Sequence, residues 1–241
     1  MNAVCLLCRK PDRIWCEFLN DFKNYKVFLM IDDCSIDLTE LKKDYSNLEF
    51  VQIEDESCVV HNYTKINYFV KKDITAWEKA LFYFHNLNNQ FSNIWFIEDD
   101  VFFYDENVLF NIDKEYPEED LLTRFSFNPK ENEDKWGPIS LLTLPIQSAM
   151  CCVVRMSKKM LKAIDDFVLV EKRFCFLEIL FPTLATTKKL NYKNPKQLDS
   201  VLFNPDKKIR HKVFTDLLYT NLFHPVKDIY KHKIYREGIL H

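Results

Sequence analysis

The sequence predicts an α/β fold in which a mainly parallel central sheet is covered by helices. Apolar runs of strand length alternate with segments of helical periodicity through residues 1–104, and this order requires crossovers that leave neighbouring strands parallel. The run 93–103 carries apolar residues on both sides of three acids, as expected of a strand buried on both faces. The predicted strands end in charged residues, and ligands of open α/β sheets collect at that edge.

The first predicted strand is 4–7, and Arg9 stands at its carboxyl end. Pro11 is well placed in the first turn of a following helix, because proline needs no backbone N–H there. The apolar residues of that helix recur at helical spacing and predict one buried face. They are Ile14, Trp15, Phe18, Leu19 and Phe22.

A second strand is predicted at 27–31, and it runs directly into the acidic sequence 32–37. Residues 39–45 are predicted to form a short helix. The alternating pattern at 48–53 predicts a third strand, which closes with the acids 54–56.

Residues 57–72 have weak periodicity and predict a loop, whereas 73–89 is the clearest helix of the chain. Its apolar residues form a stripe with helical spacing. The stripe consists of Trp77, Ala80, Leu81, Phe84 and Leu87. Glu78 and Lys79 lie off this stripe.

Composition turns polar and acidic from 105 to 138, which predicts a long surface excursion containing Trp136. Strands are expected at 139–144 and 148–155. Ser157 is a suitable N-cap for the next helix, whose inward residues are predicted as Met160, Leu161, Ile164, Phe167 and Val168.

The segment 174–185 is apolar around a single acid, Glu178, and Pro182 is expected to end or bend a helix there. After Lys188 the chain becomes loop-rich, and it finishes in a basic tail at 223–236.

Composition excludes several classes of protein. The 241 residues fit one large domain, and a net charge of −3 provides no general basic field for a nucleic acid. The chain has only 2 glycines, which excludes both a glycine-rich phosphate loop and the dinucleotide-binding fingerprint. If a nucleotide binds, carboxylates, a metal and basic side chains must hold it.

The 8 cysteines lie mostly within apolar runs, as reduced thiols do. We therefore expect no disulfides, and we interpret the Cys5-x-x-Cys8 pair as structural instead of a zinc or redox motif. The chain begins without a secretory pattern, and no run approaches the roughly 18 apolar residues of a membrane span. The sequence thus predicts a cytoplasmic protein without a membrane span.

Glu98, Asp99 and Asp100 are consecutive acids at the end of the predicted central strand. Like charges this close raise one another's pKa unless a cation or a proton intervenes, and carboxylate oxygens suit Mg²⁺ or Mn²⁺. The alternative is a strand that ends in a solvated acidic turn.

Two motifs resemble those of GT-A-fold glycosyltransferases. The sequence Asp32-Asp33-Cys34-Ser35-Ile36-Asp37 resembles their second-strand D-D-x-S-x-D signature, and the run 95–103 resembles their D-x-D strand, with Glu98-Asp99-Asp100 as a variant. Cys34 stands where the family has glycine. The resemblance covers 1–104 well and the later segments 144–157 and around Glu178 more loosely.

The resemblance implies a single GT-A-like domain over 1–241, Rossmann-like, with a nucleotide-sugar-binding half at 1–104 and a loop-rich acceptor half at 105–241. It implies a hexosyl- or pentosyltransferase acting in glycan biosynthesis. The donor would be a nucleotide-diphosphate sugar, with UDP favoured and GDP possible, and the acceptor a glycan or glycoprotein.

The resemblance also implies a role for each matching acid. Asp100 would coordinate Mn²⁺ or Mg²⁺ directly, Glu98 would reach the ribose, or the metal through water, and Asp99 would belong to the same donor-binding group. Asp32 and Asp33 would hydrogen-bond the nucleobase or ribose. For these two the alternative is a turn or a helix cap.

Basic residues complete the implied donor site. Arg9 stands where family members touch the nucleotide, and Lys79 is a second candidate, although an exposed helix lysine is the commoner interpretation. His224 is the candidate for the histidine that completes the metal shell, and Lys227 would meet the diphosphate. His211, His232 and His241 are weaker choices for the histidine.

Glu178 is either the general base that takes a proton from the attacking hydroxyl or the partner of a buried cation. As a base it favours direct displacement with inversion, whereas a role in binding sugar hydroxyls leaves retention open. Trp136 is a candidate for stacking on the acceptor sugar, with a core position as the alternative.

Two other functions fit the same acids. One is metal-dependent phosphoryl transfer, with the basic tail on phosphate. The other is a glycosyltransferase-like scaffold that binds without catalysis.

Overall fold

The computed structural model describes residues 1–65, 73–87, 90–126, 148–202 and 219–238 of the chain. Their strands form one sheet in the order β3-β2-β1-β4-β6-β5-β7. The strands are β1 (Asn2–Cys8), β2 (Tyr25–Ile31), β3 (Leu48–Gln52), β4 (Asn93–Glu98), β5 (Leu121–Ser126), β6 (Ser148–Ser157) and β7 (Tyr192–Lys193). β4 lies in the middle of the sheet, as the acid-ended apolar run predicted.

The sheet is mainly parallel, which confirms the predicted fold class. β1 pairs in parallel with β2 and β4, and β2 does so with β3. β6 is antiparallel to both β4 and β5, while β7 is parallel to β5. The strands of the first half thus meet at one carboxyl edge, and the strands of the second half extend the same sheet.

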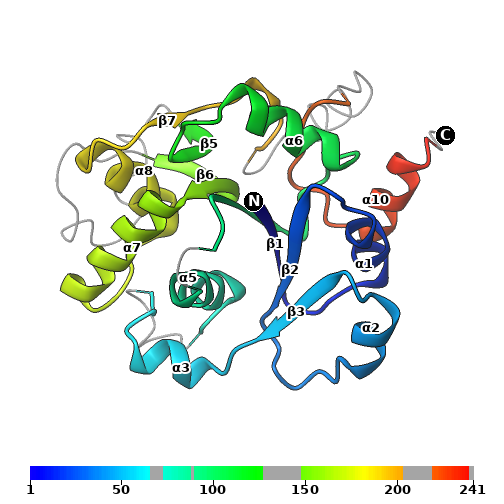
Figure 1. The fold of residues 1–241 in the computed structure, drawn as a ribbon, viewed down its shortest axis with the longest axis horizontal. Helices are drawn as coiled ribbons and strands as arrows, with labels where there is room; N and C mark the ends of the chain where they lie inside the picture. Colours follow the sequence, from blue (N-terminus) through cyan, green and yellow to red (C-terminus); the bar gives the residue numbers. More distant parts are fainter. Residues whose placement is uncertain (66–72, 88–89, 127–147, 203–218, 239–241) are drawn as a thin grey trace.

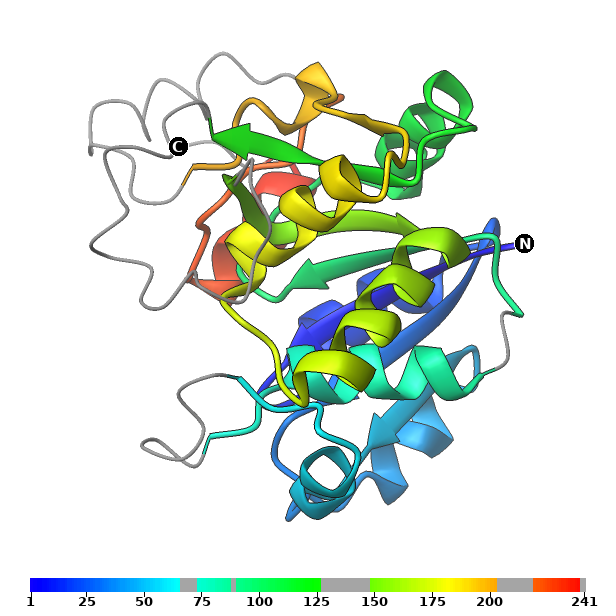
Figure 2. The same ribbon diagram turned by 90° about the vertical axis from the view of Figure 1, so that its left-hand side faces the viewer.

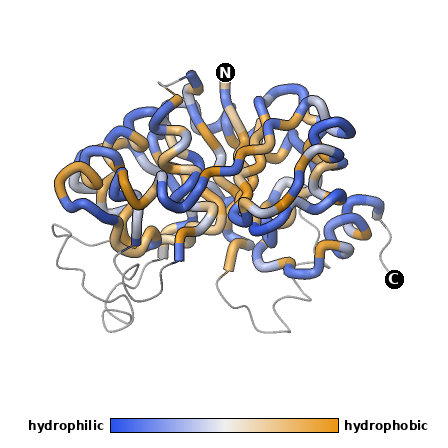
Figure 3. The backbone as a smooth tube through the Cα atoms, turned by 90° about the horizontal axis from the view of Figure 1, so that it is seen from below, coloured by the Kyte–Doolittle hydropathy of each residue, from blue (hydrophilic) through white to orange (hydrophobic). Residues whose placement is uncertain are grey.

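Helices cover both faces of this sheet (Figure 1). They are α1 (Arg13–Asn20), α2 (Thr39–Asp44), α3 (Asp55–Val60), α5 (Ala76–Asn86), α6 (Glu106–Glu115), α7 (Lys158–Glu171), α8 (Leu177–Thr187) and α10 (Ile229–Arg236), with a 3₁₀ turn at Lys196–Leu198. One core lies between the sheet and α5, α7 and α8, which cross in front of the strands in Figure 2. The other lies between the sheet and α1 and α6. In Figure 3, apolar stretches of the backbone trace run through the middle of the molecule.

Several predicted elements are confirmed. β6 and the short helix α2 form where expected, and Ser157 caps α7 by accepting hydrogen bonds from the backbone N–H groups of Lys159 and Met160. All cysteines are free, and Cys5 and Cys8 are buried in β1. Within the described part of the chain, no helix has the length and apolar character needed to cross a membrane.

The predicted loop at 57–72 was wrong over its first residues, where α3 forms. This helix has six residues and buries only Cys58, so its apolar pattern is too short to show a period. Asp55 and Glu56 occupy its first turn, where negative charge is favourable. These two acids therefore begin a helix and do not close the third strand.

Glu78 and Lys79 lie off the apolar stripe of α5, yet both are fully buried. Glu78 forms a capping box with Thr75, accepting 2.7 Å and 2.6 Å hydrogen bonds from its backbone N–H and its hydroxyl. It also pairs with Lys65 at 3.0 Å. Charged side chains can be buried at this helix start because each has a partner.

The surface excursion predicted at 105–138 was wrong over its first part, which contains α6 and β5. Asp105 caps α6, and the buried residues Val108, Leu109 and Ile112 alternate with charged ones. Polar and charged residues surround this narrow apolar stripe in the sequence, so the stripe did not indicate a helix. Residues 127–147, which include Trp136 and the predicted strand 139–144, lie outside the described residues.

Pro182 lies inside α8 and does not end it, since Leu184 and Ala185 beyond it still pack in the core. The predicted basic tail is likewise an ordered part of the fold. α10 packs on α1, where the Arg236 guanidinium lies 3.4 Å from the ring centre of Phe18 and its Nε donates to Phe103 O at 3.1 Å. The sequence did not predict this packing of α10, because basic residues alternate with apolar ones along the helix.

Candidate functional site

The end of β4 carries a compact group of potential metal ligands. Glu98 is the last residue of β4, Cys152 comes from β6 and His224 from the C-terminal segment, and their ligand atoms lie within 4.8 Å of one another. Asp100 Oδ1 lies 3.3 Å from His224 Nε2. The structure therefore brings together all three residues that the sequence proposed as metal ligands.

Backbone pairing places His224 at this end of the sheet. Phe102 and Phe223 exchange two hydrogen bonds of 2.8 Å, and the N–H of Val226 donates to Asp100 O at 2.7 Å. These bonds align residues 223–226 beside residues 100–102. The histidine is thus delivered to the acids by a contact between segments that are distant in the sequence.

The His224 ring is oriented by its other nitrogen. Nδ1 lies 2.6 Å from Leu202 O, so it donates its hydrogen there, and in the neutral ring Nε2 faces Asp100 with a lone pair. This arrangement is typical of metal-bound histidines. Burial acts to lower the pKa of His224, but attraction to Asp100 and Glu98 outweighs it, and the pKa is raised.

Glu98 and Asp100 are partly buried, whereas Asp99 is exposed in the turn that follows β4. Burial raises the pKa of Glu98, partly offset by a 2.8 Å hydrogen bond from Trp77 Nε1. Burial of its carboxyl group and the charge of Asp100 raise the pKa of Asp99 to about 6. Asp100 Oδ1 is buried, and the only donor close to it among the described residues is the His224 ring, which donates to it only when Nε2 is protonated. Among the residues that the structure describes, no lysine or arginine pairs with Glu98 or Asp100, so a bound cation would satisfy both.

A second group of charges lies at the end of β2. Lys79 Nζ lies 2.6 Å from Asp32 O, 3.6 Å from Asp32 Oδ1 and 2.7 Å from Asp55 Oδ1. Burial acts to lower the pKa of Lys79, but the bond to Asp55 outweighs it and the pKa is raised. Lys79 is therefore not the exposed helix lysine of the alternative interpretation, and it fastens the loop after β2 to α5.

Asp33 and Arg9 lie at the same edge with different surroundings. The Asp33 carboxylate accepts hydrogen bonds of 3.1 Å and 2.6 Å from the N–H and hydroxyl of Ser35, which lower its pKa. This is the turn role that the sequence left open for it. Arg9 is exposed, and its carbonyl accepts a 3.1 Å bond from Asp33 N–H. A nucleotide contact by either residue stays a prediction.

The two charge groups are neighbours because of the strand order. β1 lies between β2 and β4, with Cys8 opposite Ile31 and Leu7 opposite Glu98. Asp32 N–H donates to Cys8 O at 2.9 Å, and Asp99 N–H donates to Leu7 O at 3.2 Å. The loops that carry the acids thus leave the same edge of the sheet, as the parallel topology predicted.

Glu178 and Lys227 lie around this edge. Glu178 is in the first turn of α8, burial raises its pKa, and its charge contributes to the raised pKa of Glu98. Lys227 is exposed and follows Val226, which is bonded to Asp100. His232 is buried against Trp15, with Nε2 2.8 Å from Val226 O, which is a structural position. His211 and His241 lie outside the described residues.

Three residues of the site were missed in the sequence: Trp77, Cys152 and Asp55. Trp77 was assigned to the core stripe of α5, and its ring does pack there, but its N–H reaches Glu98. Cys152 was counted as a small apolar residue. Only the strand pairing places it near Glu98, since β6 pairs with β4 up to Ile97 and Val153.

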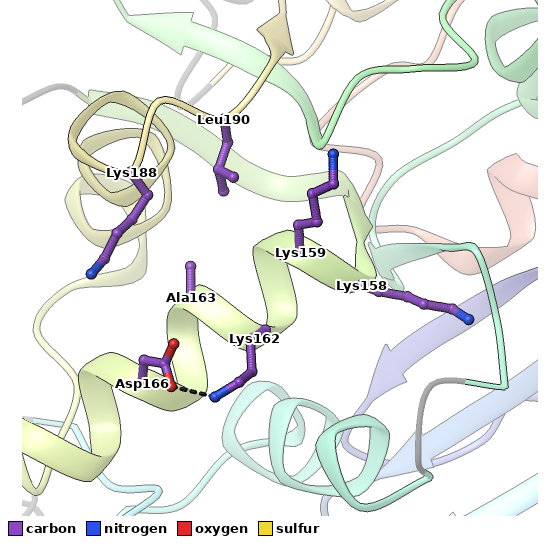
Figure 4. Close-up of a pocket in the computed structure, with 7 residues that line it drawn as sticks. All are labelled: Lys158, Lys159, Lys162, Ala163, Asp166, Lys188 and Leu190. Atoms are coloured by element: carbon purple, nitrogen blue, oxygen red, sulfur yellow. Dashed lines mark hydrogen bonds and ion pairs between the residues drawn. The ribbon is translucent and has the colours of Figure 1, made fainter.

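A cavity of about 650 Å³ lies elsewhere, between α7 and the end of α8 (Figure 4). It is lined by Lys158, Lys159, Lys162, Lys188, Ala163, Asp166 and Leu190. It contains none of the acids, histidines or lysines of the two charge groups at the strand ends, and the Lys162 ammonium pairs with Asp166 within it. We therefore place the candidate site at the strand ends.

Together, the sheet order and the acids at its carboxyl edge define a GT-A fold. No family model matches the chain, and no curated protein matches it in sequence. Two solved structures of the galactosyltransferase LgtC have similar folds. One, in complex with donor and acceptor sugar analogs, is 9% identical, with a TM-score of 0.54, covering 99% of this chain and 96% of that chain. The other, an active-site mutant, is 10% identical, with a TM-score of 0.55 and the same coverage.

Proposed function

We propose that this protein is a metal-dependent glycosyltransferase that moves a sugar from a nucleotide-diphosphate donor to a hydroxyl acceptor, with a glycan as the acceptor class. The observation that carries the proposal is the convergence of Glu98, Asp100 and His224 at the end of the central strand, beside the Asp32 loop. The likeness in fold to a galactosyltransferase that binds donor and acceptor sugar analogs supports it.

The residues present fit a divalent cation. Asp100 Oδ1 is a buried acceptor that has no hydrogen bond when His224 is neutral, and His224 then presents a lone pair oriented through Leu202. Asp100 and His224 would bind the cation directly, with Glu98 held beside them by Trp77. When bound, Mn²⁺ or Mg²⁺ supplies a Lewis acid that neutralises the charge developing on a diphosphate leaving group.

The remaining residues would bind and orient the donor. Lys227 is exposed next to the cation site and would meet the diphosphate. Asp32 and Arg9 would contact the nucleoside, with UDP as the favoured nucleotide and GDP as the other. Lys79 would hold the Asp32 loop in position through its bonds to Asp32 and Asp55.

Glu178 would act on the acceptor. Its burial raises its pKa, which makes its carboxylate a stronger base near neutral pH. If Glu178 accepts the proton of the attacking hydroxyl, the reaction is a direct displacement that inverts the anomeric centre. If it only binds sugar hydroxyls, a retaining reaction stays open, and the stereochemistry of the product distinguishes inversion from retention.

A thermal-shift screen tests this function. UDP, GDP and their sugar conjugates are added with and without Mn²⁺, to the wild type and to the variants Asp100→Ala and Glu118→Ala. Glu118 is an exposed acid away from the site and serves as the control. We expect stabilisation only when nucleotide and Mn²⁺ are both present, lost in Asp100→Ala and kept in Glu118→Ala. If nucleotides stabilise the protein equally with and without Mn²⁺, the result would favour the non-catalytic scaffold instead.

A further inference from the structure

We propose that Cys152 is a fourth ligand of the cation, and that its sulfur shifts the preference of the site from Mg²⁺ toward Zn²⁺ and Co²⁺. The inference rests on the metal-holding part of the proposed function and is independent of sugar transfer. Its starting point is geometric, because Cys152 Sγ lies within 4.8 Å of ligand atoms of both Glu98 and His224.

An irregularity in β6 directs this side chain. Leu122 pairs with Arg155 and Arg124 pairs with Met150, so residues 151–154 of β6 stand opposite Thr123 alone. Such a β-bulge breaks the alternation of side chains, and bulges beside active sites commonly redirect one. Here Cys152 and its neighbour Val153 pack in the same core, whereas Cys151 packs in the core on the other face.

Ligand chemistry gives the metal preference. Carboxylates alone suit Mg²⁺, whereas thiolate and imidazole favour Zn²⁺ and related transition metals. Two carboxylates, one imidazole and one thiolate form a mixed oxygen, nitrogen and sulfur set. Catalytic zinc sites keep a position for water or substrate and can expand to five ligands, so a site with these four protein groups would take a phosphate oxygen as its fifth ligand.

Binding requires one covalent change in the protein. As the bond between sulfur and the cation forms, the S–H bond of Cys152 breaks and its proton leaves to solvent. No electron is transferred, and no co-reactant is needed. The residue Cys152 is 8% exposed, so the cation would bind a largely buried sulfur.

The experiment is a Co²⁺ titration of the full chain, followed by absorption spectroscopy with and without UDP or GDP. A Co²⁺–thiolate bond gives a near-ultraviolet charge-transfer band, whereas carboxylate and imidazole ligands give only the weak visible bands. We expect the band in the wild type and in Cys151→Ser and Cys34→Ser, and its loss in Cys152→Ser and Cys152→Ala. Cys151→Ser is the matched control, because it removes the adjacent thiol on the other face.

Competition gives a second measurement. Zn²⁺ should displace Co²⁺ from the wild type, while excess Mg²⁺ should not. Cys152→Ala should weaken Zn²⁺ binding by at least the roughly 10–100-fold that loss of an outer-shell partner causes.

The outcomes separate this inference from the proposed function. If Co²⁺ binds the wild type but gives no charge-transfer band, Cys152 is not a ligand of the cation. This result does not depend on whether any variant folds. It leaves the metal-binding role of Asp100 and His224 unchanged. A band that persists in both Cys152 variants also overturns it. Absence of Co²⁺ binding under every condition overturns the metal part of the proposed function as well.

Discussion

His224 Nε2 lies 3.3 Å from Asp100 Oδ1, although the two residues are 124 positions apart in the sequence. The contact exists because Val226 and Phe223 are hydrogen-bonded to the backbone of residues 100 and 102. A buried carboxylate oxygen and the lone pair of the neutral imidazole thus point at the same small space.

Replacing His224 with alanine should weaken Mn²⁺ binding, because the cation loses its nitrogen ligand. We expect a loss of at least about 10–100-fold, the range seen when even an outer-shell partner is removed. Isothermal titration of Mn²⁺ in the presence of UDP measures it. His61→Ala is the control, since His61 is an exposed histidine on α3's C-terminal side. Equal affinity in both variants would remove His224 from the site.

Metal binding should also weaken as pH falls through the raised pKa of His224, because only neutral imidazole binds a cation. Without metal the sign is opposite. The folded-state pKa is raised, so the ion pair with Asp100 stabilises the protein below the unfolded pKa of about 6.5. That stabilisation is lost as pH rises through the folded pKa. Urea unfolding at several pH values, with and without Mn²⁺, should show these opposite trends in the wild type and neither in His224→Ala.

Asp99→Asn should stabilise the metal-free protein at neutral pH. The pKa of Asp99 is raised to about 6, so the folded protein binds its proton more tightly than the unfolded chain does. The contribution of Asp99 to the free energy of unfolding therefore falls as pH rises from about 4 to about 6. We expect the variant to melt above the wild type at pH 8 and at the same temperature at pH 3. A lower melting temperature at pH 8 would contradict this.

Lys79→Met should destabilise the fold, since it leaves Asp32 and Asp55 without their shared partner. Hydrogen bonds to charged groups contribute about 1.5–3 kcal/mol to the free energy of unfolding, and urea denaturation measures the loss. Lys162→Met is the matched control because Lys162 is an exposed lysine that pairs with Asp166 on α7. Such surface pairs contribute about 0–1 kcal/mol, so an equal effect in both variants would argue against a buried role for Lys79.

Trp77→Phe keeps the ring in the core and removes the N–H that donates to Glu98. We expect metal affinity to fall roughly 10–100-fold, as it does when an outer-shell partner is lost, with little change in stability. Trp95→Phe is the control, because Trp95 Nε1 donates to Asp113 at 3.1 Å and not to the acids of the site. If only Trp95→Phe lowered metal affinity, the role assigned to Trp77 would be wrong.

Much of the fold was readable from local patterns. Three features depend only on residues that are close in the sequence, namely the buried run of β4, the Ser157 cap and the apolar stripe of α5. The local pattern of polar and apolar residues therefore predicts them directly. The parallel order of the first strands followed from the helices between them. By contrast, α6 and α3 were missed because their apolar positions are few and lie among charges.

By itself, the sequence determined that three acids end a buried central strand, and it singled out His224 and Asp32 as their companions. Only the tertiary structure decided that Cys152 joins the metal ligands, that Trp77 holds Glu98 and that Lys79 is buried. The physical reason is that these contacts cross between elements. Antiparallel pairing of β6 with β4, and pairing of Phe223 with Phe102, bring them together, and neither pairing leaves a periodic signal along the chain.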